Sequence, residues 1–193
     1  MEIENHINQI TESYSKKENW KKVQKILKPY VNKNDAHPLY LINYAIALYY
    51  DFKYEDAIEY SAKAYEHRAN DPFVMYHHGI ILMVNKKFNQ AIEIFEKILS
   101  FPEDYLFYGE YGDGKRWAHS LLNNVRYYIA RTFFYKNDLD NAIKFYKSHI
   151  ANRKRGIPSF LTKREVLQDL DGAVILKDYE HKHPERAKPI IEG

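Results

Sequence analysis

The 193-residue sequence contains no cysteine, which excludes disulfide bonds, thiolate metal ligands and a cysteine nucleophile. It has no long hydrophobic run either. Its longest apolar stretch, counting tyrosine, is residues 44–50, far short of the ~20 residues of a membrane-spanning helix. The polar, acidic N-terminus lacks the basic stretch and apolar segment of a secretory signal. We therefore expect a soluble, cytoplasmic protein with no membrane partner.

Neither positive nor negative charge is in large excess, because the formal net charge is only +3 at pH 7. Such a value does not by itself indicate binding to a polyanion. Aromatic residues, in contrast, are abundant, with 18 Tyr and 10 Phe in a chain that is 45% hydrophobic. This composition is typical of a folded protein, and the length favours a single domain.

A repeat of 34 residues organises the chain. The sequence around Ala57 recurs around Ala91 and again, after an insertion, around Ala142. This period is typical of stacked helix-turn-helix units. In each unit a large apolar residue opens the second helix and a small or short residue follows three positions later, so that helices can approach closely. These pairs are Trp20 and Val23, Tyr54 and Ala57, Phe88 and Ala91, and Leu139 and Ala142.

Helix-start signals agree with this frame. Asp71 followed by Pro72 provides a capping carboxylate and a proline at the first helical position, and Pro38 stands one period earlier. Thr162 and Glu165 fit a capping box for a short helix covering the last unit. We predict paired helices at 3–16 and 19–32, 38–51 and 54–67, 72–85 and 88–100, and 115–136 and 139–151.

The pattern of small and large residues resembles the tetratricopeptide repeat (TPR) family. The matching residues are Ala45, Leu48, Tyr54, Ala57 and Ala64 in one unit, and Gly79, Leu82, Phe88, Ala91 and Phe95 in the next. The resemblance implies an all-α fold, a right-handed superhelical array of antiparallel helix pairs (a TPR-like solenoid) with a C-terminal capping helix. We expect one domain over residues 1–170, with units at about 4–37, 38–71, 72–105 and 123–156, a loop inserted near 101–116, and a tail at 171–193.

The same resemblance implies that a protein or peptide partner binds in a concave groove lined by the first helix of each unit. The groove would be aromatic, which is typical of binding surfaces. The alternative is that the tail or the inserted loop fills the groove and makes these rings part of the core. The positions carried over are Asn43, Ile46, Tyr49, Tyr50, Phe73, Tyr76, His77, Ile80, Asn124, Tyr127, Tyr128, Arg131 and Tyr135.

Basic residues gather near the fourth unit and could contact an acidic partner group: Lys115, Arg116, Arg153, Lys154 and Arg155. The plainer interpretation is a solvated turn that complements a helix C-terminus. Gly109, Gly112, Gly114 and Lys115 partly resemble a phosphate-binding loop, but Arg116 replaces the Ser/Thr that binds magnesium. A glycine-rich turn is the simpler prediction.

No set of residues indicates catalysis, a metal site or a cofactor. The histidines show no metal-ligand spacing, and no serine lies in a nucleophile motif. We therefore expect a non-enzymatic protein-interaction module that acts as adaptor, chaperone or inhibitor. One alternative is an immunity-type protein that neutralises a cognate toxin. A second is a binder of nucleic acid or a phosphate ligand through the basic end of the fourth unit, although nucleic acid is not the expected partner.

Overall fold

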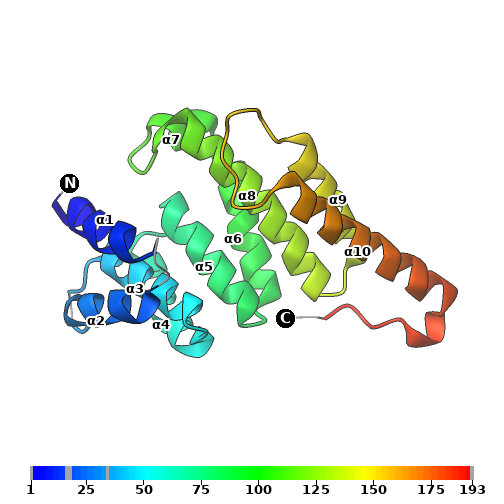
Figure 1. The fold of residues 1–193 in the computed structure, drawn as a ribbon, viewed down its shortest axis with the longest axis horizontal. Helices are drawn as coiled ribbons and strands as arrows, with labels where there is room; N and C mark the ends of the chain where they lie inside the picture. Colours follow the sequence, from blue (N-terminus) through cyan, green and yellow to red (C-terminus); the bar gives the residue numbers. More distant parts are fainter. Residues whose placement is uncertain (1, 16–18, 34, 192–193) are drawn as a thin grey trace. The chain divides into compact units, whose positions relative to one another are not determined.

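A computed structural model describes residues 2–15, 19–33 and 35–191 (Figure 1). Within these residues the chain is helical and contains no β-strand. It forms two compact units, Met1–Asn85 and Lys86–Gly193, here called the N-terminal and C-terminal units. The helices are α1 (Glu2–Ser15), α2 (Trp20–Val31), α3 (Pro38–Tyr50), α4 (Tyr54–His67), α5 (Pro72–Val84), α6 (Phe88–Ser100), α7 (Glu103–Tyr108), α8 (Gly114–Tyr135), α9 (Leu139–Ala151) and α10 (Lys163–Lys182), followed by a 3₁₀ turn, Pro184–Arg186.

The all-α prediction is confirmed, and the eight helices of the four expected pairs lie within one or two residues of their predicted bounds. Residue 16, the expected end of the first helix, lies outside the described residues. No described helix is long and apolar enough to cross a membrane.

In the N-terminal unit, α3 packs against α4, α2, α1 and α5. The contact between α3 and α4 is close because Ala45 and Ala57, the small residues of the repeat, are completely buried. Leu27 and Ile42 fill the core beside them. The repeat therefore reflects packing, since a larger side chain at either alanine would separate the two helices.

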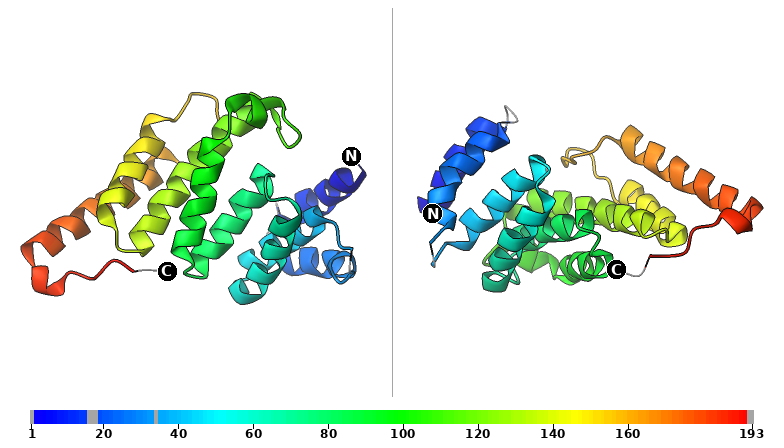
Figure 2. Two further views of the ribbon diagram at one scale, coloured as in Figure 1. Left: turned by 180° about the vertical axis from the view of Figure 1, so that it is seen from behind. Right: turned by 90° about the horizontal axis from the view of Figure 1, so that it is seen from below.

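In the C-terminal unit, α8 packs against α6, α7 and α9, and α10 lies alongside α9 (Figures 1 and 2). Thr162 and Glu165 form the predicted capping box at the start of α10: the Thr162 hydroxyl accepts from the Glu165 amide at 3.2 Å, and the Thr162 amide donates to the Glu165 carboxylate at 2.6 Å. Val166 and Ala173 of α10 are completely buried in one cluster with α8 and α9.

Two segments differ from the sequence prediction. Residues 101–116 were expected to form a loop, but they include α7, because Leu106 and Phe107 bury their side chains in a cluster with Ala118 of α8. The capping helix was expected to be short and to be followed by a tail from residue 171, yet α10 continues to Lys182. Burial of Ala173, seven residues after Val166, continues the apolar side of the helix past Gly172.

The last described residues return to the turn between α8 and α9. The Ile191 amide donates to the Lys136 carbonyl at 2.7 Å, and the Asn137 side-chain amide donates to the Lys188 carbonyl at 2.6 Å. The segment after α10 is thus held by hydrogen bonds within the C-terminal unit.

Candidate protein-binding site

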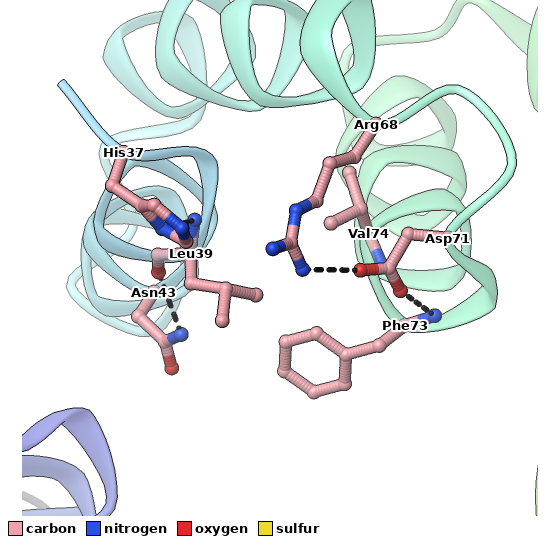
Figure 3. A network of polar contacts seen from close by, with 7 residues as sticks. All are labelled: His37, Leu39, Asn43, Arg68, Asp71, Phe73 and Val74. Atoms are coloured by element: carbon pink, nitrogen blue, oxygen red, sulfur yellow. Dashed lines mark hydrogen bonds and ion pairs between the residues drawn. The ribbon is translucent and has the colours of Figure 1, made fainter. Parts of the chain in front are cut away.

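The start of α5 is fixed by Asp71, which is almost completely buried (Figure 3). One carboxylate oxygen accepts hydrogen bonds from the backbone amides of Phe73, at 2.9 Å, and Val74, at 3.3 Å. The other oxygen pairs with the Arg68 guanidinium at 3.1 Å. This N-cap, with Pro72 at the first helical position, fixes the first turn of α5 and so the direction in which the Phe73 side chain projects from the helix.

The start of α3 is built in a similar way. His37 Nδ1 accepts a hydrogen bond from the Leu39 amide at 3.2 Å, and the Asn43 side chain donates to the Leu39 carbonyl at 2.8 Å. In Figure 3 the side chains of Leu39, at the start of α3, and Phe73, at the start of α5, point toward each other, and the Arg68 side chain reaches toward them from the end of α4. Asn43, predicted to line the groove, is half-buried.

An aromatic cluster of five rings lies where α2, α3 and α4 meet. Trp20 stacks on Tyr50 with ring centroids 4.2 Å apart, Tyr50 meets Tyr49 at 5.0 Å, Tyr49 meets Tyr54 at 5.8 Å, and Tyr54 meets Phe52 at 6.3 Å. Tyr50 is 47% exposed and Phe52 79% exposed. Two predicted groove residues, Tyr49 and Tyr50, are therefore joined in one partly exposed apolar surface.

Phe52 is the most exposed large apolar residue of the cluster, and its backbone is unusual. Its φ angle is +61°, in the left-handed region, as are those of Lys86 (+61°) and Asn137 (+65°), which occupy the equivalent turns after α5 and α8. Asparagine tolerates this conformation, whereas in a bulky aromatic residue it is sterically unfavourable. The Phe52 ring buries little apolar area in the fold although its backbone is strained, and this combination marks a candidate binding position.

The groove residues on α5 differ in accessibility. Tyr76 and Ile80 are buried, whereas Phe73 and His77 are half-buried. The His77 ring meets Phe73 edge to face at 4.6 Å and Tyr76 at 5.0 Å. Burial lowers the pKa of His77 well below its ordinary value, so the imidazole is neutral at pH 7. On α3, Ile46 is half-buried against the core of the N-terminal unit.

Two groove residues predicted on α8 belong to the core of the C-terminal unit. Tyr127 is 3% exposed and its hydroxyl donates to Asp169 of α10 at 2.8 Å. Asn124 is 4% exposed and its Oδ1 accepts from the Ser159 hydroxyl at 3.0 Å. The expectation of an open surface at these two positions is therefore wrong, because α10 and the segment before it cover them.

The remaining groove residues of α8 are more accessible. Arg131 donates to the Tyr127 hydroxyl at 3.4 Å and to the Tyr135 hydroxyl, and its guanidinium lies 5.1 Å from the centre of the Tyr135 ring. Tyr135 is 40% exposed. Tyr128 is half-buried and stacks on Phe95 of α6 at 6.2 Å.

The predicted basic residues separate into two groups. Lys115, Arg116 and Arg155 are exposed, and the Lys115 ammonium lies 5.7 Å from the centre of the Phe107 ring. Arg153, which is half-buried, and Lys154, which is exposed, border a cavity between α8 and the segment that follows α9.

The glycine-rich segment is a tight turn before α8. A Cβ atom at Gly109 would lie 2.5 Å from the Tyr105 carbonyl oxygen, and one at Gly112 would lie 2.9 Å from backbone atoms of residues 106–108. Gly114 has φ of +80°. Close packing and backbone conformation therefore account for these glycines. Among the described residues, no three His, Asp or Glu side chains are placed to hold a metal ion together.

No family model matches the sequence, and no curated protein matches it. The solved structures that are similar in fold include two of MamA. Residues 41 to the end of MamA from Desulfovibrio magneticus RS-1 superpose with a TM-score of 0.64 at 15% identity, covering 94% of this chain and 89% of that one. The MamA RS-1 ArsTM double mutant superposes with a TM-score of 0.62 at 16% identity, covering 94% and 88%.

At this level of identity the likeness concerns the fold alone. MamA contains tetratricopeptide repeats, so the likeness agrees with the arrangement of helices predicted from the 34-residue period. The chain therefore has a TPR-like, all-α fold.

Proposed function

We propose that this chain is a non-catalytic protein-binding module that acts as an adaptor, chaperone or inhibitor. TPR-like repeats expose surfaces that suit extended or helical segments of another protein. The observation that carries the proposal is the aromatic cluster, in which Phe52 is 79% exposed on a left-handed turn and Tyr50 is 47% exposed. Exposed rings of this kind bury much apolar area on binding and lose little rotamer entropy.

The binding surface proposed for the N-terminal unit combines this cluster with the accessible first-helix residues. Asn43 and Ile46 extend it along α3, and Phe73 and His77 contribute from α5. Tyr76 and Ile80 support the surface from below, since both are buried. Because these rings are neutral and apolar, binding depends on desolvation more than on charge.

Affinity capture from the native cell with mass spectrometry tests the proposal. The bait is the full chain, compared with the variants Phe52→Gly and Lys86→Gly. Both substitutions place glycine at a residue with positive φ, at equivalent positions of two different turns. Only Phe52→Gly removes an aromatic ring. A protein retained by the full chain and by Lys86→Gly, and lost with Phe52→Gly, supports the proposal. A partner retained equally by all three baits contradicts the role of the cluster.

A second measurement separates this function from phosphate-dominated binding. The affinity for the captured partner should change little between 50 and about 200 mM salt, whereas contacts with several phosphates would weaken binding by orders of magnitude over that range. Steep salt dependence would therefore contradict an interface formed by aromatic burial.

A further inference from the structure

A small cavity in the C-terminal unit is lined mainly by cationic and polar side chains. Its volume is about 90 Å³, enough for several waters. It lies between α8 and the segment after α9, which is held beside α8 by the Ser120 hydroxyl donating to the Pro158 carbonyl at 2.8 Å. The described residues that line it are Glu103, His119, Leu122, Asn123, Arg126, Asn152, Arg153, Lys154, Ile157 and Ser159.

Three cations border this cavity, Arg126, Arg153 and Lys154, against one carboxylate, Glu103. Among the described residues, none of the three cations forms an ion pair with a carboxylate. Lys154 Nζ lies 3.3 Å from His119 Nε2. Three positive charges beside a single carboxylate leave the cavity with an excess of positive charge, which attracts an anion.

The internal contacts of the two arginines leave most of their donors available. Arg126 donates from Nη1 to the Leu122 carbonyl at 3.0 Å, and Arg153 donates from Nη1 to the Leu161 carbonyl at 2.9 Å and lies 3.2 Å from His149 Nε2. A guanidinium carries five N–H donors. A purely structural role therefore explains one nitrogen of each arginine and leaves the others without a protein partner in the described part.

Two further observations point to a missing ligand. Asn123, which borders the cavity, is 5% exposed, and its Oδ1 is buried without a hydrogen-bond partner among the described residues. Buried polar atoms are ordinarily paired, so an unpaired one beside a polar cavity indicates an absent water or ligand. In addition, burial lowers the pKa of Arg126, which means that its charge is desolvated and gains from a nearby anion.

We propose that this cavity binds a phosphate group, held by Arg126, Arg153 and Lys154. Arginine forks match the oxygens of a phosphate, and the ammonium of Lys154 adds a third positive contact. A phosphate that retains one proton also carries a hydroxyl, which can donate to an unpaired acceptor such as that of Asn123. The cavity volume suits the group itself, either as inorganic phosphate or as the terminal phosphate of a small monoester. This site lies in the C-terminal unit and is independent of the proposed protein-binding surface.

Calorimetric titration of the full chain at low salt with inorganic phosphate and with glycerol 3-phosphate tests the proposal. Lys154→Gln should weaken phosphate binding about fivefold or more, and Arg126→Gln about tenfold or more, because each removes a charge-assisted contact. Arg155→Gln is the matched control, since Arg155 is exposed and does not line the cavity. It should change the affinity less than about twofold, as expected for an exposed charge outside the site. Thermal unfolding by circular dichroism verifies that each variant is folded.

The outcomes distinguish the sources of the phosphate group. Equal affinity for both probes assigns the site to the free anion, and tighter binding of glycerol 3-phosphate assigns it to a monoester; either result supports the proposal. Absence of binding at millimolar phosphate would overturn it. An equal loss of phosphate affinity in Arg155→Gln and Lys154→Gln would also overturn it, because it would indicate diffuse charge attraction. A parallel titration with acetate should give weaker binding than phosphate, and tighter binding of acetate would contradict the proposal.

Discussion

The hydroxyl of Tyr127 on α8 donates a hydrogen bond to Asp169 of α10 at 2.8 Å, across 42 residues of sequence. Tyr127 is also buried against Tyr146 of α9, with ring centroids 5.8 Å apart. A single side chain therefore connects three helices of the C-terminal unit. Burial and the nearby carboxylate raise the pKa of Tyr127, so the hydroxyl stays protonated and donates at any physiological pH.

Replacing Tyr127 with Phe removes this hydrogen bond while keeping the buried ring. We expect the free energy of unfolding to fall by about 1 kcal/mol, as for loss of a buried hydroxyl contact that leaves its acceptor unpaired. Urea denaturation followed by circular dichroism measures it. Tyr135→Phe is the control, because Tyr135 is 40% exposed, and it should cost less than about 0.5 kcal/mol. Equal stability of Tyr127→Phe and the unmodified chain would contradict this account of α10.

The role of Asp71 as N-cap and ion-pair partner predicts a graded effect of two substitutions. Asp71→Ala removes both contacts and should lower the free energy of unfolding by about 2 kcal/mol. Asp71→Asn keeps an oxygen for the Phe73 and Val74 amides but loses the charge that pairs with Arg68, so it should cost about half as much or less. Urea denaturation of both variants measures the difference. A larger loss for Asn than for Ala would refute the capping role.

Stability should depend on pH through His78. This residue is buried, its Nδ1 lies 2.9 Å from the Ser61 hydroxyl, and its ring stacks on Tyr65 at 5.1 Å. Burial lowers the pKa of His78 from 6.5 to about 4. Above pH 6.5 neither the folded nor the unfolded state is protonated. Between pH 6.5 and 4 the unfolded state binds a proton that the folded state rejects, so the free energy of unfolding decreases as the pH falls.

The loss attributed to His78 should reach about 1.4 kcal/mol at pH 5.5 relative to pH 7.5. Urea denaturation at the two pH values measures it in the unmodified chain and in His78→Gln, which should lose this part of the pH dependence. If His78→Gln and the unmodified chain lose stability in parallel, His78 is not the titrating group.

The left-handed turn at residue 52 predicts a gain of stability from glycine. Phe52 is 79% exposed, so its removal sacrifices little buried area, while glycine adopts φ of +61° without steric cost. We expect Phe52→Gly to raise the free energy of unfolding by about 1 kcal/mol. Thermal and urea unfolding measure the change. A decrease would show that the Phe52 ring stabilises the fold and would weaken its assignment to binding.

Much of the helical framework could be predicted because the repeat constrains it. Ala57, Ala91 and Ala142 recur in register with helix starts such as Asp71, and each of these residues is buried in the expected place. A small residue at a helix crossing is a strong requirement, because any larger side chain would separate the helices.

The accessibility of the groove residues could not be predicted in the same way. Tyr127 occupies a position equivalent to the predicted groove residues of the other units. It is nevertheless buried, because α10, which lies outside the repeats, covers it through Asp169. The extent of α10 was hidden by Asp171 and Gly172, since these residues weaken a helix in isolation and are tolerated here because Val166 and Ala173 pack on either side of them.

The sequence also predicted only part of the aromatic cluster. The period places Trp20 and Tyr54 at the start of second helices, and the family resemblance assigns Tyr49 and Tyr50 to the groove, but neither indicates that Phe52 joins them. The signal that could have identified Phe52 is its place in the turn, where the equivalent residues Lys86 and Asn137 also have positive φ. An aromatic residue at a position that favours asparagine or glycine indicates a role other than folding.

The most direct test of protein binding is the affinity of the captured partner for Phe52→Gly and for Lys86→Gly, measured by calorimetry alongside the unfolding free energy of each variant. We predict that both variants are at least as stable as the unmodified chain. Phe52→Gly should bind the partner about tenfold or more weakly, as expected for an interface anchor, and Lys86→Gly should bind it with unchanged affinity. Full affinity in the stable Phe52→Gly variant would contradict the proposed binding surface.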